Sequence, residues 1–164
     1  MPSIEGGGVE KNLFIISNFL AKKFNKTMII TSNLNFKKKF KKQIVITPNH
    51  KFNKNDGRYI RYFFCLYELI KQTLYQKKKF VVFAFQANLY CAIICKLFNI
   101  DIITRSNSSP SGWSKNFIKR ALFKLLLRIP KLIIVNSIKF KLELKKTFGI
   151  NSFCIYNPLD KYNV

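Results

Sequence analysis

Residues 80–104 read FVVFAFQANLYCAIICKLFNIDIIT, a stretch that predicts a strand, a helix and a second strand in direct succession. The first six residues form an unbroken apolar run, which is typical of a strand covered on both faces. The helix is expected over residues 87–98 and the next strand over 101–104. Two strands joined through a helix run parallel, so this stretch predicts an α/β fold.

The same alternation continues on both sides of this stretch. Apolar side chains recur at helical spacing from Val9 to Phe24, and the glycines Gly6, Gly7 and Gly8 come just before them. Further strands are expected at 27–31, 43–47, 132–135 and 153–156, with helices at 59–76, 113–128 and 138–147. The pattern predicts one doubly wound, mostly parallel sheet in a single Rossmann-like domain over residues 1–164. We expect the strands at 80–85 and 132–135 to be central and fully buried.

The composition excludes a disordered chain but leaves the partners open. Of the 164 residues 48% are hydrophobic, and 30 Lys and Arg against 7 Asp and Glu give a net charge of +23. Such a charge suits nucleic acid, an anionic membrane surface or phosphorylated substrates. A compositional bias towards Lys explains it equally well, because the basic residues are scattered through every segment. No signal peptide or membrane-spanning stretch is visible, so a cytoplasmic location is expected, free or peripheral on the inner face of the membrane.

The cysteines and the histidine suggest no metal site and no cofactor. Four cysteines lie in apolar runs without a CxxC pair, which favours buried free thiols. The one histidine, His50, lies in a polar loop. The carboxylates form no close pair, so the sequence assigns no catalytic residue.

Three polar clusters lie at predicted strand ends or turns, where ligands of α/β folds bind. They are the Gly6–Gly8 turn, the pair Gln86 and Asn88, and the loop that begins with Arg105 and Asn107. Glycine allows close backbone approach, whereas amides and an arginine bind sugar hydroxyls or phosphate. Each cluster also has a structural explanation: a tight turn, helix capping, or a solvated surface arginine.

Five short motifs together resemble the N-terminal domain of family-4 glycosyltransferases of the GT-B fold. In that family a GG-[AV]-E-[RK] turn follows the first strand, and a YNP-[IL]-D segment leads into the second domain. The matching residues occur here in the same order: Gly6-Gly7-Gly8-Val9-Glu10-Lys11, Phe85-Gln86-Ala87-Asn88, Arg105-Ser106-Asn107-Ser108-Ser109-Pro110, Val135-Asn136-Ser137 and Tyr156-Asn157-Pro158-Leu159.

The resemblance implies a retaining hexosyltransferase of polysaccharide biosynthesis that uses a nucleotide-sugar donor and a glycan or lipid-linked acceptor. It implies that this chain shapes the acceptor side, with Gly6, Gly7, Gly8, Gln86, Asn88, Arg105 and Asn107 as substrate-binding candidates. The donor site of the family lies in a C-terminal domain, which is expected to be absent here, as is the first strand. The chain alone is therefore expected to be inactive. The alternative is a basic α/β module that binds nucleic acid or an anionic membrane, although no motif for specific nucleic-acid binding is present.

The helix expected at 113–128 is a candidate for membrane docking. Its apolar residues Phe117, Ile118, Ala121, Leu122 and Leu125 are expected to pack on the sheet. Basic residues, among them Lys119, Arg120 and Lys124, would then project outward, where an anionic leaflet attracts them. The alternative is a solvated basic face.

Overall fold

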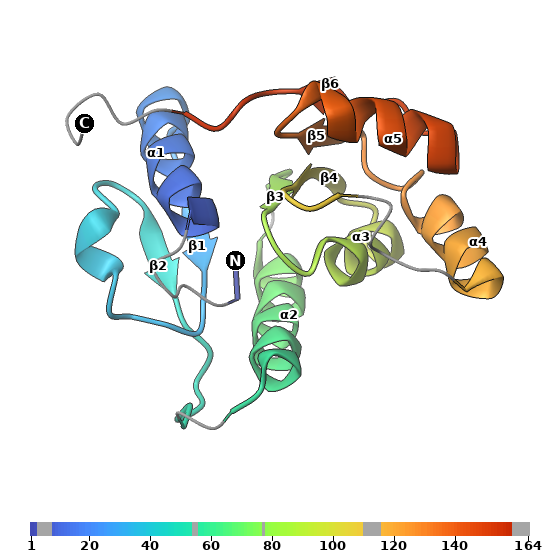
Figure 1. Ribbon diagram of the computed structural model, residues 1–164. Coiled ribbons are helices and arrows are strands. Elements are labelled where there is room, and N and C mark those ends of the chain that lie inside the picture. The colour runs from blue at the N-terminus through green and yellow to red at the C-terminus, as the bar shows by residue number, and fades with distance from the viewer. Residues whose placement is uncertain (3–7, 54–55, 77, 110–115, 159–164) are drawn as a thin grey trace. The chain divides into compact units, whose positions relative to one another are not determined.

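Parallel strands and helices alternate along the chain, as the sequence predicts (Figure 1). The computed structural model describes residues 1–2, 8–53, 56–76, 78–109 and 116–158. They divide between two compact units, Met1–Gln76 with Pro158–Val164, and Lys77–Asn157. Every strand pair in the described residues is parallel, which confirms the α/β class and the parallel pairing, but the described strands form a two-stranded and a four-stranded sheet instead of the one sheet expected.

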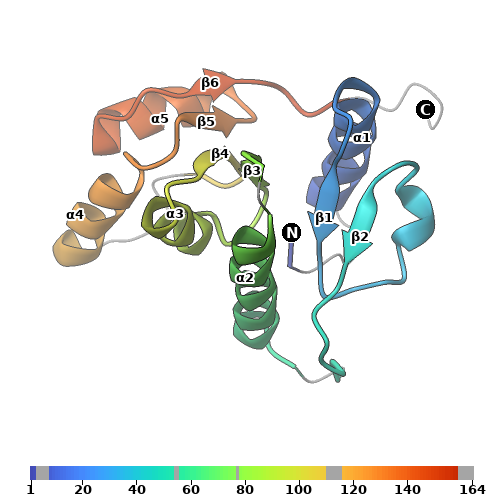
Figure 2. The ribbon, with the colours of Figure 1, turned by 180° about the vertical axis from the view of Figure 1, so that it is seen from behind.

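The described residues of the first unit form two strands and two long helices. Its elements in chain order are α1 (Gly8–Lys23), β1 (Met28–Ile30), the short 3-10 helix η1 (Lys37–Lys39), β2 (Ile44–Ile46) and α2 (Arg58–Tyr75). Figure 2 shows β1 and β2 side by side, with the η1 turn in the segment that connects them. The helix α1 begins one residue before the expected Val9.

The helix α1 packs on the connection between β1 and β2. The ring of Phe14 lies 5.9 Å from that of Phe36 and 5.1 Å from that of Phe40. The Asn18 amide donates to the carbonyl oxygen of Lys39 (3.0 Å) and accepts from the backbone N–H of Lys41 (3.1 Å). These bonds attach the Lys-rich connection to α1.

The first two residues lie beside the end of β1. The amino group of Met1 donates to the carbonyl oxygen of Ile30 (2.9 Å). The backbone N–H of Ser32 donates to the carbonyl oxygen of Pro2 (3.0 Å), and the Ser32 hydroxyl donates to the same oxygen (2.6 Å). The expected absence of the first strand stays a prediction, because residues 3–7 lie outside the described ranges.

The second unit is built on a four-stranded sheet with the strand order β3-β4-β5-β6. Its strands are β3 (Val81–Ala84), β4 (Asp101–Ser106), β5 (Leu132–Val135) and β6 (Phe153–Cys154), and its helices are α3 (Asn88–Leu97), α4 (Phe117–Leu126) and α5 (Ile138–Phe148). The strand register pairs Ala84 with Thr104, Thr104 with Ile133, and Val135 with Cys154.

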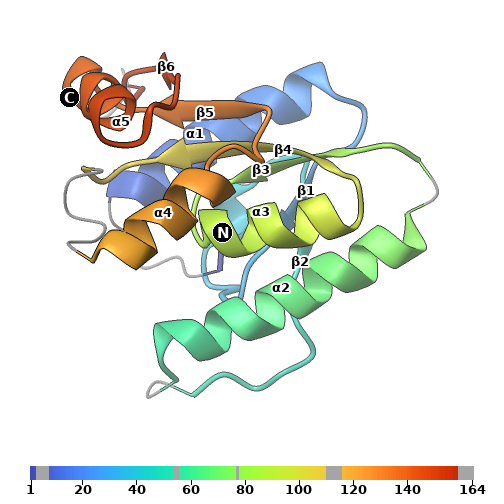
Figure 3. The same cartoon turned by 90° about the vertical axis from the view of Figure 1, so that its right-hand side faces the viewer.

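The helices α3 and α5 pack on the sheet face that carries Ile102, Ile133 and Val135. Ala92 and Cys95 of α3 lie in one buried cluster with Ile102. Leu144 of α5 lies in a second cluster with Ile133 and Val135. Figure 3 shows α3 and α4 in front of strands β3 to β5. Burial of these apolar side chains is the main stabilising term of the unit.

Two expectations about this unit are wrong in part. The strand β5 is central and largely buried as predicted, but β3 lies at an edge of the four-stranded sheet and Val81 is 57% exposed. The apolar residues of α4 do not pack on the sheet, because Phe117 is 83% and Ile118 76% exposed. Only the other side of α4 is covered, where Phe123 packs against the second cluster. No helix in the described part of the chain is long and apolar enough to cross a membrane.

Candidate functional site

Asparagines line the edge of the four-stranded sheet where its strands end. Asn88 begins the helix after β3, Asn107 follows β4 and Asn136 follows β5. The side-chain oxygen of each is buried, and none of the three has a hydrogen-bond donor among the described residues. We call these three residues the amide row. Buried acceptors without donors are rare in folded proteins and cost roughly 1–3 kcal/mol each, so these oxygens are available to accept hydrogen bonds from water or from a ligand.

Arg105 lies on β4, two residues before Asn107, and its side chain binds the segment that follows β6. Its side chain is only 1% exposed, and its Nη2 atom donates to the carbonyl oxygen of Ile155 (3.0 Å) and to Oδ1 of Asn157 (3.0 Å). The Nε atom has no acceptor among the described residues. Burial lowers the pKa of Arg105, because a guanidinium ion is poorly solvated there. The residue is thus placed to position the segment after β6.

The backbone of β4 also holds the first member of the amide row. The Asn88 side-chain nitrogen donates to the carbonyl oxygen of Arg105 (2.9 Å). The N-cap position of α3 is taken by Ala87, not by Asn88. Asn88 therefore connects the start of α3 to the end of β4, and the capping explanation for it does not apply.

The turn between β3 and α3 is strained at Ala87. This residue has φ 53° and ψ 29°, in the left-handed region. A residue with a Cβ atom pays about 1–2 kcal/mol for this conformation. Strained backbone of this kind is often found at functional sites, and here it directs Asn88 towards the strand ends.

The amide row consists of three asparagines and therefore supplies no acid or base. The carboxylate of Glu143 on α5 is engaged by the Ser109 hydroxyl, which donates to it at 2.5 Å. The described residues contain no cluster of three His, Cys, Asp or Glu that could hold a metal ion. The row offers hydrogen-bond acceptors, which suits a ligand rich in hydroxyl or N–H groups.

The predicted site residues fall into two groups. Gly6 and Gly7 lie outside the described residues, and Gly8 is the exposed first residue of α1, where a Cβ atom would meet only open space. Gln86 and Asn88 follow β3, and Arg105 and Asn107 belong to the end of β4, so these four share the carboxyl edge of one sheet.

Asn136 is a site residue that sequence reasoning missed. It appears in one of the five motifs, but the motif alone does not distinguish it as a ligand-binding residue. Its position directly after a strand was the available signal, because Asn107 stands at the equivalent position of the neighbouring strand β4.

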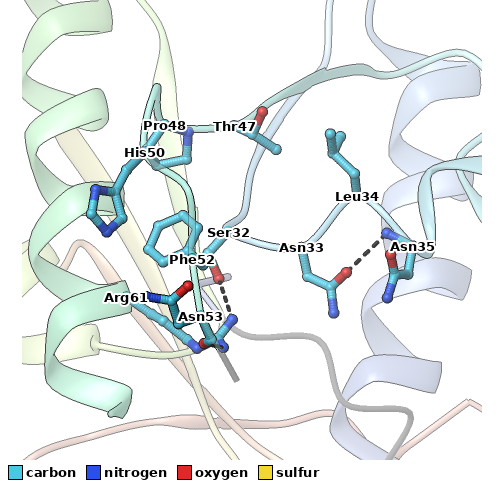
Figure 4. Close-up of a pocket in the computed structure, with 10 residues that line it drawn as sticks. All are labelled: Ser32, Asn33, Leu34, Asn35, Thr47, Pro48, His50, Phe52, Asn53 and Arg61. Atoms are coloured by element: carbon cyan, nitrogen blue, oxygen red, sulfur yellow. Dashed lines mark hydrogen bonds between the residues drawn. The ribbon is translucent and has the colours of Figure 1, made fainter. Parts of the chain in front are cut away.

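A hollow lies in the first unit, where β1 and β2 end (Figure 4). It has a volume of about 340 Å³ and is bordered by the segments that follow β1 and β2 and by Arg61 of α2. The ring of His50 stacks on that of Phe64 (3.9 Å between centroids), and its Nε2 atom lies 3.9 Å from Oδ2 of Asp56. The sequence alone indicates only a loop position for His50 and does not single out Arg61.

The fold of the chain is that of a known α/β protein with a bound nucleotide. The sequence matches no protein-family model and no curated protein. Among solved structures, the chain is similar to HepE (Alr3699) of Anabaena in complex with UDP and glucose, with a TM-score of 0.68 at 16% identity over 98% of this chain and 43% of that one. HepE in complex with UDP alone gives a TM-score of 0.60 at 15% identity, covering 97% and 43%. The chain thus spans less than half the length of HepE, and the likeness shows a shared fold.

Proposed function

We propose that this chain is the acceptor-side domain of a glycosyltransferase that moves a hexose from a nucleotide-sugar to a glycan or lipid-linked acceptor. The observation that carries the proposal is the amide row, three buried oxygens that need donors and lie at the ligand-binding edge of a parallel sheet. The five motifs that resemble family-4 glycosyltransferases support it. HepE, which shares the fold, was solved with UDP and glucose, the two parts that make up a nucleotide-sugar.

In this proposal the amide row accepts hydrogen bonds from acceptor hydroxyls. Asn88, Asn107 and Asn136 supply the oxygens, and Gln86 borders the same edge. Arg105 is a positioning residue, since its buried guanidinium group reaches other residues of the chain. The Gly6–Gly8 turn would lie near the sugar in transfer, as the resemblance implies.

Donor binding and the reaction itself would require groups beyond this chain. The resemblance places the nucleotide on a C-terminal domain and implies transfer with retention, in which positioning and charge stabilisation of the leaving group dominate. Polysaccharide biosynthesis in the cytoplasm is the process that the resemblance implies.

The test is a titration of the isotope-labelled chain with glucose, followed by NMR through the side-chain amide signals of Asn88, Asn107 and Asn136. We expect these signals to shift saturably with millimolar affinity. Asn136→Ala should weaken binding about fivefold to tenfold, because one hydrogen bond is worth about 1 kcal/mol. Asn151→Ala removes an amide from an exposed position and is the control.

UDP is the second ligand of this experiment. Since the resemblance places the nucleotide site on a C-terminal domain, residues 1–164 alone should bind UDP no more tightly than about 1 mM, or roughly 4 kcal/mol. Micromolar binding of UDP would place the donor site on this chain. Glucose binding that leaves the three asparagine signals unmoved would contradict the role of the amide row.

The exposed face of α4 favours an additional role at an anionic membrane surface. Phe117, Ile118, Leu122 and Leu125 share this face, and all four are more than half exposed. Basic side chains flank them at Lys119, Arg120 and Lys124. A helix with apolar residues on one face and lysines beside them inserts into the headgroup region of anionic bilayers.

Vesicle sedimentation tests this role by comparing phosphatidylglycerol with phosphatidylcholine. The triple variant Lys119→Glu, Arg120→Glu, Lys124→Glu should lose binding to phosphatidylglycerol, since each basic residue contributes about 1 kcal/mol at such a surface. The triple variant Lys139→Glu, Lys141→Glu, Lys146→Glu on α5 carries the same change of charge and is the control. If both variants pellet to the same extent, α4 has no special part in binding.

A further inference from the structure

The hollow of the first unit gathers hydrogen-bond donors from three directions. Asn33 follows β1, Thr47 and His50 follow β2, and Arg61 comes from α2 (Figure 4). None of the ten described residues that border the hollow is acidic. It is therefore a place where a negatively charged group meets several donors at once.

Arg61 is charged but is held only by neutral oxygens. Its Nη1 atom donates to the Ser32 hydroxyl (3.4 Å), its Nη2 atom to the carbonyl oxygen of Asn53 (3.3 Å) and its Nε atom to that of Asp56 (3.4 Å). All three bonds are long, and no carboxylate lies within salt-bridge distance of Arg61 in the described part of the chain. A ligand can replace such contacts at little cost.

The neighbouring carboxylate of Asp56 is occupied elsewhere. Its Oδ2 atom accepts the backbone N–H of Asn53 (2.7 Å) and faces His50 at 3.9 Å. The ring of Phe52 lies under the guanidinium group of Arg61, 5.5 Å from its carbon, which limits the arginine to one side of the hollow.

We propose that this hollow binds the phosphoryl group of a small phosphate monoester. A tetrahedral phosphate has three terminal oxygens and suits donors from three directions, whereas a planar carboxylate offers two. The Arg61 guanidinium group, the Asn33 amide and the Thr47 hydroxyl border one space and come from three different segments. The volume exceeds that of a phosphate ion and leaves room for the remainder of an ester. This inference concerns a different unit from the amide row and does not depend on transferase activity.

The single histidine of the chain provides the probe. Its imidazole proton gives one isolated NMR signal, which is followed while inorganic phosphate replaces chloride at constant ionic strength. We expect a saturable shift for the unmodified chain and a loss of affinity of at least about tenfold in Arg61→Gln. Arg58→Gln removes the same charge from an exposed position on the same helix and should bind phosphate as the unmodified chain does.

A second pair of variants guards against a folding defect in Arg61→Gln. Asn33→Asp keeps the oxygen that accepts the backbone N–H of Asn35 (2.9 Å) and adds a negative charge to the hollow, so phosphate binding should again be lost. Asn151→Asp keeps the oxygen that accepts from Lys145 (2.8 Å) and is the matched control in the other unit.

The outcomes distinguish a specific phosphate site from the general attraction of anions to a chain with a net charge of +23. A shift that does not saturate, or equal weakening in all four variants, overturns the proposal. Competition by glucose 1-phosphate identifies a soluble ester, and competition by vesicles that contain phosphatidic acid identifies a lipid source. If inorganic phosphate binds but neither ester competes, the site holds an adventitious ion only and the proposal fails.

Discussion

Replacing Arg105 by alanine should destabilise the second unit by about 3–5 kcal/mol. The Nη2 atom makes two hydrogen bonds at 3.0 Å, and hydrogen bonds of a charged group contribute about 1.5–3 kcal/mol each. The cost of burying the guanidinium group, seen in its lowered pKa, offsets part of this sum. The variant also leaves the carbonyl oxygen of Ile155 and the amide oxygen of Asn157 without the donor that Arg105 supplies.

Urea denaturation followed by circular dichroism measures the loss, and native-state hydrogen exchange locates it. The backbone N–H of Ile155 donates to the carbonyl oxygen of Val135 (2.9 Å) and should exchange faster in Arg105→Ala. Lys131→Ala is the contrast, because Lys131 forms an exposed ion pair with Asp101 (2.6 Å) that is worth at most about 1 kcal/mol.

A double-mutant cycle isolates the contact with Asn157. Asn157→Ala should cost about 2 kcal/mol alone and much less in the Arg105→Ala background, because the bond is already lost there. The reasoning is refuted if Arg105→Ala costs no more than Lys131→Ala and leaves the exchange of Ile155 unchanged. That result would mean that the buried charge costs as much as its bonds contribute.

Three further predictions concern the rest of the chain. Leu144→Ala should cost about 2–5 kcal/mol in urea denaturation, since Leu144 is fully buried, whereas Leu142→Ala at a 63% exposed position should cost under about 0.5 kcal/mol. Gly149→Ala should lower the thermal midpoint by the equivalent of about 1–2 kcal/mol, because this C-cap has φ 68°, while Gly57→Ala with φ −63° should not show that loss. Burial, and secondarily the neighbouring thiol of Cys91, raises the pKa of Cys95 from 9.0 to about 12. The stabilising contribution of the neutral thiol is therefore complete below pH 9 and is lost as the pH rises towards 12. Alkylation of Cys95 at about pH 8.5 should be slow until urea unfolds the chain, and rapid alkylation in buffer would contradict this.

Local patterns are sufficient to predict most elements of the fold. The strand Leu132–Val135 has the bounds that the sequence predicts, and the helix Ile138–Phe148 differs by one residue at its end. Apolar spacing, the glycine after the helix and the N-cap Ser137 lie within or beside the segment itself, so the sequence reports them directly.

Properties that depend on distant segments are not predictable in this way. The apolar run of β3 indicates covered faces but says nothing about neighbours on its edges, and the strand lies at an edge of the four-stranded sheet. The periodicity of α4 identifies an apolar face but not what covers it, and Phe117 is exposed.

In the candidate site, too, the sequence predicts what a local pattern marks and misses what depends on distant segments. Polar residues at strand ends mark Asn88, Asn107 and Arg105 correctly as neighbours of one sheet edge. The sequence could not show that Arg105 turns to Asn157, 52 positions further on, instead of to a ligand. The hollow near Arg61 is missed because three separate segments form it, and none of them carries a recognisable motif.

The bonds of Arg105 also connect two residues that follow different strands of the sheet. Its guanidinium group holds Asn157, and its backbone carbonyl oxygen holds Asn88 (2.9 Å). Because one residue holds both asparagines, we expect a ligand bound to Asn88 to favour one position of Asn157, and by thermodynamic reciprocity we expect a displacement of Asn157 to change the affinity for that ligand.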